Sequence, residues 1–217
     1  QTTILNAGGG YTNYQWNGAL PATQTVTVGT AGNYTVTVTN ANLCTGTATT
    51  VVTVNALPNP IITGDNSICT GTTTTFDAGP GFTNYQWSGG LGAGQTITTG
   101  TANTYTVTVT NANGCTKSKD VTLTVNPLPT PVITGTNIIC AGTSTIFNAG
   151  PGYTTYLWSG GLPATQNVSV NTAGTYTVTV TDGNGCTKST TRNLTVNANP
   201  TPSITGVTTI CAGQTTT

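Results

Sequence analysis

The sequence predicts an all-β protein built as a tandem array of short antiparallel sandwiches. The whole chain of 217 residues repeats with a period of 71 residues, so that Trp16, Trp87 and Trp158 hold one position of the repeat. Within each repeat, apolar and polar residues alternate over short segments, which is the pattern of half-buried strands. Thr, Val and Gly dominate while helix-forming residues are sparse, so no helix is expected.

The individual strands follow from this alternation. Residues 105–110 place Tyr and Val on one face and Thr on the other, and residues 34–39 and 176–181 repeat the pattern. An Asn-Gly turn at 113–114 then leads into a second alternating segment at 121–125. Shorter strand segments are expected at 74–76, 85–87 and 95–98, and an extended piece at 131–134 opens the next repeat. About six or seven short strands per repeat fit a two-sheet sandwich.

The aromatic residues indicate which kind of sandwich this is. An immunoglobulin-like sandwich carries a core Trp in its third strand and a Tyr near the start of its penultimate strand. Both positions are aromatic in every copy of the repeat. We therefore expect an immunoglobulin-like core that contains Trp16, Trp87, Trp158, Tyr34, Tyr105 and Tyr176.

Four segments also carry a resemblance to a known family: Ile139-Cys-Ala-Gly, Tyr156-Leu-Trp-Ser-Gly, Thr175-Tyr-Thr-Val-Thr-Val-Thr-Asp and Asn184-Gly-Cys. With them, the whole chain resembles the immunoglobulin-like or PKD-like repeats of Bacteroidota cell-surface and secreted proteins. Such repeats form large adhesin or filament-type arrays. The resemblance implies an extracellular or cell-surface location in a Gram-negative bacterium, and it supplies no catalytic residue that could be carried over.

Proline-rich segments recur at one phase of the repeat, at 55–60, 126–131 and 197–202. Proline lacks an N–H and fixes φ, so such segments interrupt sheets and act as stiff connections. We expect a repeat without its first strand at 1–57, complete repeats at 58–128 and 129–199, and a first-strand stub at 200–217. Because Gln1 and Gln214 hold the same phase, the chain is expected to be a stretch of a longer array or fibre.

The charge content excludes several functions. The chain has four basic residues, four acidic residues, no His and a net charge of zero. Without His or paired carboxylates there is no general base to activate a nucleophile, so we expect no enzyme, no cofactor and no metal site. Four basic residues are too few to bind a nucleic-acid backbone. No apolar run approaches the roughly 20 residues of a membrane span.

Six cysteines without His or a Cys-x-x-Cys motif indicate disulfides formed in an oxidising compartment. Pairing across a linker, as in Cys44–Cys69, fits the expected topology poorly. We favour a bond between consecutive repeats, Cys69–Cys186, because the two residues face each other across the junction. The open alternative is pairing within each repeat, as Cys69–Cys115 and Cys140–Cys186. In the favoured scheme, the cysteines that need partners outside the sequence are Cys44, Cys115, Cys140 and Cys211.

Near-identical repeats, stiff linkers, disulfides and few charges together predict a structural role. We expect a segment of an extracellular rod or filament, serving as a stalk, fibre or surface appendage, whose partners are adjacent repeats or further copies of itself. The alternative is an adhesin module that binds surface glycans or other surfaces through exposed aromatic side chains.

Overall fold

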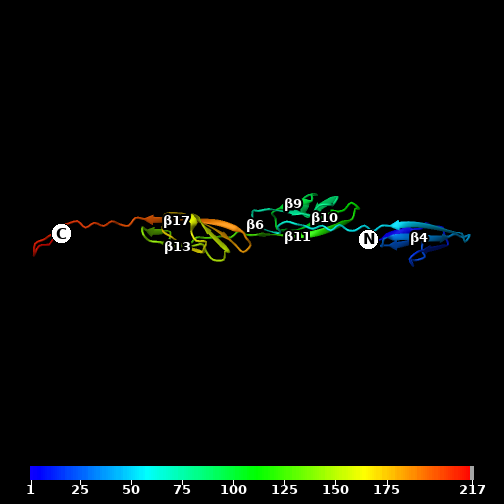
Figure 1. Ribbon diagram of the computed structural model, residues 1–217, viewed down its shortest axis with the longest axis horizontal. Coiled ribbons are helices and arrows are strands. Elements are labelled where there is room, and N and C mark those ends of the chain that lie inside the picture. Colours follow the sequence, from blue (N-terminus) through cyan, green and yellow to red (C-terminus); the bar gives the residue numbers. More distant parts are fainter. Residues whose placement is uncertain (216–217) are drawn as a thin grey trace. The chain divides into compact units, whose positions relative to one another are not determined.

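The computed structural model describes residues 1–215, and nearly all of the regular secondary structure in these residues is short β-strand, which confirms the all-β, immunoglobulin-like prediction (Figure 1). The chain divides into two compact units. The first contains Gln1–Ile62, Asp77–Gln95 and Thr106–Asp120, and the second contains Thr63–Phe76, Thr96–Tyr105 and Val121–Thr217. The division into repeats at 57/58, 128/129 and 199/200 stays a prediction from the sequence.

The first unit begins with two facing sheets, which we call the N-terminal sandwich. One sheet pairs β1 (Thr3–Asn6) with β3 (Thr25–Val28), and the other has the order β2-β4-β5. The strands of the second sheet are β2 (Asn13–Trp16), β4 (Gly32–Thr39) and β5 (Thr45–Val52). Every pairing is antiparallel. The core between the sheets consists of Trp16, Val26, Val28 and Val36.

Further along the first unit, β8 (Asn84–Trp87) pairs antiparallel with β10 (Asn103–Thr110), which contributes residues to both units. A 3-10 turn, η1 (Ser88–Gly90), follows β8. In the second unit, β7 (Thr74–Asp77) and β9 (Thr96–Thr99) share a two-stranded sheet. There β6 (Ser67–Cys69) lies parallel to the end of β11 (Thr116–Asn126), so that Cys69 is opposite Asn126.

The second unit also contains the C-terminal sandwich, which we define as β12 to β17. A four-stranded sheet has the order β12-β17-β16-β14, and a two-stranded sheet pairs β13 with β15. The strand bounds are β12 (Ile138–Cys140), β13 (Thr145–Asn148), β14 (Thr155–Trp158), β15 (Asn167–Val170), β16 (Gly174–Thr181) and β17 (Thr187–Asn197). The 3-10 turn η2 (Ser159–Gly161) follows β14. Ten buried residues fill this core, among them Phe147, Trp158 and Val178.

Two details of the secondary structure differ from the expectation. The extended piece at 131–134 forms only an isolated bridge, from Thr134 to Asn148, and no strand of several residues. Proline at 131 removes a backbone donor there, which limits ladder formation. The strand that opens the sandwich is instead β12, and it pairs with β17 in parallel, whereas the alternation pattern predicts antiparallel pairing throughout.

After Asn197 the chain forms no further strand within the described residues. Residues 200–215 are exposed throughout, and Ile204 is 102% exposed. Figure 1 shows this segment in red, extending away from β17. We call Pro202–Gly213 the C-terminal segment.

Candidate functional site

The chemistry-bearing side chains of this chain are its cysteines. Within residues 1–215, no three His, Cys, Asp or Glu side chains are grouped so that they could hold a metal ion. None of the helices in the described part of the chain has the length and hydrophobicity needed to cross a bilayer. The cysteines are therefore the site to build from the residues upward.

Cys69 and Cys186 form a disulfide with a Cα–Cα distance of 5.6 Å, which is the pairing favoured from the sequence. Both belong to the second unit. Cys69 is the last residue of β6, and its carbonyl oxygen accepts hydrogen bonds from the backbone N–H and the hydroxyl of Thr72, at 3.0 and 2.7 Å. This tight turn ends β6 and fixes the Cys69 side chain at the end of the strand.

Cys186 lies in the turn between β16 and β17, and its side chain is fully buried. The Asp182 carboxylate accepts hydrogen bonds from the backbone N–H groups of Asn184 and Cys186, both at 2.9 Å. Gly185 takes a φ of 81°, which a residue with a Cβ adopts at a cost. The turn therefore holds Cys186 at the position directly before the first residue of β17.

The same turn recurs at the preceding equivalents of Asp182. The Asn40 side chain accepts from the backbone N–H of Cys44, and the Asn111 side chain accepts from that of Cys115, both at 3.0 Å. An amide oxygen therefore performs the function of the Asp182 carboxylate in the other two copies. This agrees with a structural turn, since a side-chain oxygen that accepts two backbone N–H groups stabilises the loop by itself.

The alternative pairing within each repeat does not occur. Cys140 lies beside Asn197, the last residue of β17, whereas Cys186 directly precedes Thr187, the first residue of that strand. β17 has 11 residues, and at about 3.3 Å per residue its two ends lie roughly 33 Å apart. The Cα atoms of a disulfide lie within about 7 Å, so Cys140 and Cys186 cannot bond without unfolding the sheet.

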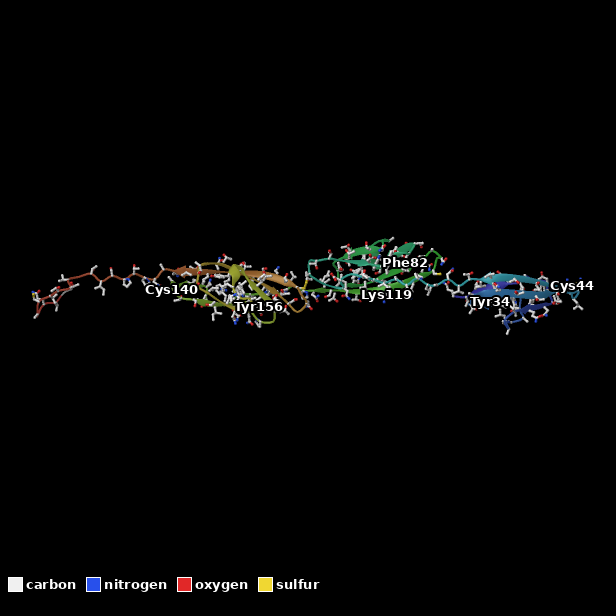
Figure 2. The ribbon with its side chains drawn as sticks, viewed as in Figure 1. Tyr34, Cys44, Phe82, Lys119, Cys140 and Tyr156 are labelled. Atoms are coloured by element: carbon white, nitrogen blue, oxygen red, sulfur yellow. A yellow bond between two sulfur atoms is a disulfide. The ribbon has the colours of Figure 1, made fainter. Side chains whose placement is uncertain are left out.

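The other described cysteines, Cys44, Cys115, Cys140 and Cys211, are free thiols. Cys44 lies in the turn between β4 and β5, and Cys140 ends β12 (Figure 2). Cys44, Cys140 and Cys211 are exposed, and Cys115 is half-buried. These four cysteines, for which partners outside the sequence were expected, therefore have no disulfide partner within the described residues.

The three tryptophans and Tyr105 are buried, as a core position requires. Each indole N–H donates to a backbone carbonyl seven residues further along the chain, in the case of Trp158 to Thr165 at 2.9 Å. Tyr34 and Tyr176 are half-buried. Their rings pack against the core, but their hydroxyls reach out to the carbonyls of Thr30 and Thr172.

Sequence reasoning missed Arg192. Its guanidinium donates to the carbonyl oxygens of Ile133 and Gly135 at 2.9 and 2.6 Å, and it lies 5.8 Å from the centroid of the Phe147 ring. It thereby connects β17 to the segment that opens the sandwich. The signal in the sequence was a lone Arg where the other copies carry Thr50 and Val121.

No protein-family model matches the chain, and no curated protein matches it. Among solved structures, a fragment of a 1.5-MDa bacterial ice-binding adhesin is 17% identical with a TM-score of 0.41, and the alignment covers 91% of both chains. The insect immune protein hemolin is 16% identical with a TM-score of 0.34, over 92% of this chain and 72% of hemolin. Immunoglobulin domains 1–4 of Sidekick-1 are 15% identical with a TM-score of 0.34, over 90% and 71%.

Proposed function

We propose that this chain is a structural segment of an extracellular rod or filament, in which disulfides join consecutive sandwich repeats. The observation that carries the proposal is the Cys69–Cys186 bond, which connects two copies of the 71-residue repeat. A bond of this kind persists in oxidising compartments such as the extracellular space. Because the bond spans a proline-containing linker at 126–131, tension on the linker is shared with a covalent bond.

The chemically inert surface supports the same function. With eight formally charged side chains among 217 residues, the chain offers little to ionic ligands. Threonines fill the outward positions of the strands, for example Thr35 and Thr49, whose hydroxyls lie 2.9 Å apart across β4 and β5. Such cross-strand pairs stabilise a sheet without charge. A stalk requires this kind of surface more than a binding module does.

A pulling experiment tests the proposal. In a chain held by its two ends, the Cys69–Cys186 bond bypasses the segment between the two cysteines, which are 117 residues apart in sequence, so the force does not stretch that segment. At about 3.5 Å per extended residue, the oxidised chain should therefore extend roughly 400 Å less than the reduced chain. If both forms reach the same final length, the disulfide bears no load and the proposal fails. The variant Cys140→Ser is the matched control, since Cys140 is a free thiol, and it should behave as the parent chain.

Glycan binding is the second function to separate from this one. Its one specific support is Tyr11, which is 41% exposed and packs edge-on against Tyr14. The tryptophans, which would make the stronger sugar platform, are buried. Binding to a glycan array that is saturable and that Tyr11→Ala abolishes would favour the adhesin module. The rod proposal expects no saturable binding with either chain.

A further inference from the structure

Each sandwich presents a long free edge along the last strand of its repeat. In the C-terminal sandwich this strand is β17, and β12 pairs with residues 195–197 of it. Among the described strands, only β16 lies beside residues 187–194 of β17. This part of the edge is therefore free although the opening strand of the sandwich, β12, is in place. The equivalent free edges are residues 116–123 of β11 and residues 45–52 of β5.

The hydrogen bonds at the end of β17 show which backbone groups this edge presents. The Thr195 N–H donates to the carbonyl of Asn137 at 2.9 Å, and the Asn197 carbonyl accepts from the Ala141 N–H at 2.8 Å. In a strand, the N–H and C=O of one residue point to the same side and those of the next residue to the other side. The residues of β5 that direct their backbone groups to the free edge are therefore Thr45, Thr47, Thr49 and Val51.

Basic side chains hinder strand pairing at two of the three edges. All four basic residues of the chain lie on these two strands: Lys117 and Lys119 on β11, and Lys188 and Arg192 on β17. Lys188 is opposite the fully buried Val180, so it belongs to the inward face of the sheet. Lys117 and Lys119 share a face with the buried Leu123. A charge on the inward face of an edge strand opposes the addition of another strand, because pairing would remove the charge from water.

The free edge of β5 carries no charge. Ala48 is the equivalent of Lys119, and it faces inward in the same way. Gly46 is the equivalent of Lys117. The edge extends over roughly 27 Å, and all of its residues except Val52 are exposed. A long, uncharged and exposed edge strand is a template on which another strand can pair.

We propose that two copies of this chain associate side by side through β5, with the two β5 strands antiparallel and a two-fold axis at Ala48. Residues that direct their backbone groups outward must lie opposite each other for the ladder to form. Centring the pair on Ala48 meets this condition and uses the whole free edge from Thr45 to Val51. Thr47 then lies opposite Thr49 of the second copy, and Val51 lies opposite Thr45 of the second copy.

Charge is the reason why the partner is a second β5 strand. If β11 paired with itself about Lys119, two lysines would lie directly opposite each other, which destabilises a sheet. If β5 paired with β11 of another copy, Lys119 would be brought against Ala48. Two β5 strands bring together only uncharged residues. Their threonine pairs repeat a contact already present in the sheet, where the hydroxyls of Thr35 and Thr49 lie 2.9 Å apart.

A lysine on β5 should prevent the association. Ala48→Lys introduces the residue found at the equivalent position 119 and sets two ammonium groups at the two-fold axis. Ala48 is exposed, and β11 accommodates lysine at this position, so the sandwich of the variant should fold as in the parent. Thr190→Lys is the matched control, because Thr190 is the equivalent residue of the C-terminal sandwich. It adds the same charge outside the proposed contact.

A proline provides a second variant, which acts on the backbone. The Thr47 N–H points to the free edge, so Thr47→Pro removes a donor of the proposed contact and no ladder bond within the sandwich. Ser189→Pro is its matched control, since Ser189 is the equivalent residue of β17.

Ala48→Cys tests the register. In an antiparallel pair that exchanges no hydrogen bonds, the two Cα atoms lie about 4.5 Å apart, which a disulfide accepts. Mild oxidation should link the introduced thiols of two copies, and peptide mapping should locate the bond at position 48.

The measurement is sedimentation equilibrium of the full chain over a range of concentrations, with the free thiols kept reduced. One strand edge is a small interface, so we expect a reversible equilibrium between monomer and dimer with the weak affinity of transient contacts. Ala48→Lys and Thr47→Pro should each raise the dissociation constant by about tenfold or more. Thr190→Lys and Ser189→Pro should leave it unchanged.

Three results would overturn the inference. The first is a chain that stays monomeric at every concentration at which it is soluble. The second is a dimer that persists unchanged in Ala48→Lys, because the contact would then belong to another edge or face. The third is an equal loss of association in Thr190→Lys, because the effect would then come from net charge. The inference adds a lateral contact to the proposed rod but makes no use of Cys69–Cys186, so either proposal can fail while the other holds.

Discussion

The Cα atoms of Cys69 and Cys186 lie 5.6 Å apart, although 117 residues separate them in the chain. The bond joins the end of one short strand, β6, to a turn that a later repeat builds between β16 and β17. Cys186 is fully buried, so an attacking thiolate reaches this disulfide with difficulty. The cross-link is therefore part of the folded state of the second unit.

Loss of this bond should lower stability strongly. Closing a loop of this length stabilises the folded state by about 5 kcal/mol in the chain-entropy model. Cys69→Ser should therefore lower the free energy of unfolding by a large part of this amount. Denaturant unfolding of the second unit, monitored through hydrogen exchange of the amides in β12 to β17, would measure the loss of stability. Cys140→Ser removes a free, exposed thiol at the equivalent position and should change stability by less than about 0.5 kcal/mol. Equal effects of the two variants would contradict this assignment.

The part of the fold that follows from local pattern was predictable. Alternation of Thr with Val and Tyr at 105–110 and 176–181 predicts strands that lie within β10 and β16. In a strand the side chains alternate between the two faces, so the sequence itself shows which residues share the buried face. The disulfide was favoured from topology, since the ends of a strand cannot approach each other. The parallel strands β6 and β12 were not predictable, because three residues are too few to show a period.

The contacts of Arg192 show a second limit. A single charged residue on a strand reads as a solvated side chain, and its partners, the carbonyls of Ile133 and Gly135, lie more than 50 residues away in sequence. The contacts of Arg192 depend on which segment covers the sandwich edge, and strand periodicity carries no information on that.

The two cores should respond differently to one kind of truncation. Phe147 is fully buried, and its ring lies edge-on to Tyr176 with the centroids 5.5 Å apart, so Phe147→Ala should cost about 3–5 kcal/mol. Its equivalent Leu5 lines an open hollow and is half-buried, so Leu5→Ala should cost about 1 kcal/mol. Hydrogen exchange of β16 and β4 amides would report the two local free energies. A larger loss for Leu5→Ala would show that the hollow is closed in solution.

Glycine is required where β13 is approached by the segment that opens the sandwich. At Gly135 a Cβ would meet the backbone of Ile146 and the Phe147 ring, and φ is 122°. Gly135→Ala should therefore destabilise the C-terminal sandwich by about 2 kcal/mol or more, from the backbone strain and the displaced contact together. Gly183→Ala is the control, since a Cβ there meets nothing within 4 Å and the φ of Gly183 lies outside the left-handed region. Thermal unfolding would separate the two, and a neutral Gly135→Ala would mean that residues 133–135 do not pack on β13.

Arg192 should determine how firmly the opening segment is attached. Replacing it with Thr, the residue at the equivalent position 50, removes two hydrogen bonds to the carbonyls of Ile133 and Gly135 and the contact with Phe147. Charge-assisted hydrogen bonds contribute about 1.5–3 kcal/mol, and the part-exposed side chain and the unpaired Nε reduce the expected net loss to about 2 kcal/mol. The Thr134 amide, which donates to Asn148 at 2.8 Å, should then exchange roughly 30-fold faster.

Arg192→Lys separates charge from geometry in the same measurement. Lysine keeps the positive charge but presents a single ammonium in place of the planar guanidinium that reaches two carbonyls. The exchange rate of the Thr134 amide in Arg192→Lys should therefore lie between the rates in the parent and in Arg192→Thr. Amides in the middle of β16 serve as the internal reference, because their exchange reports opening of the whole sandwich. If Thr134 exchanges at the parent rate in Arg192→Thr, the bridge to Asn148 holds the segment without help from the guanidinium, and the role given to Arg192 is wrong.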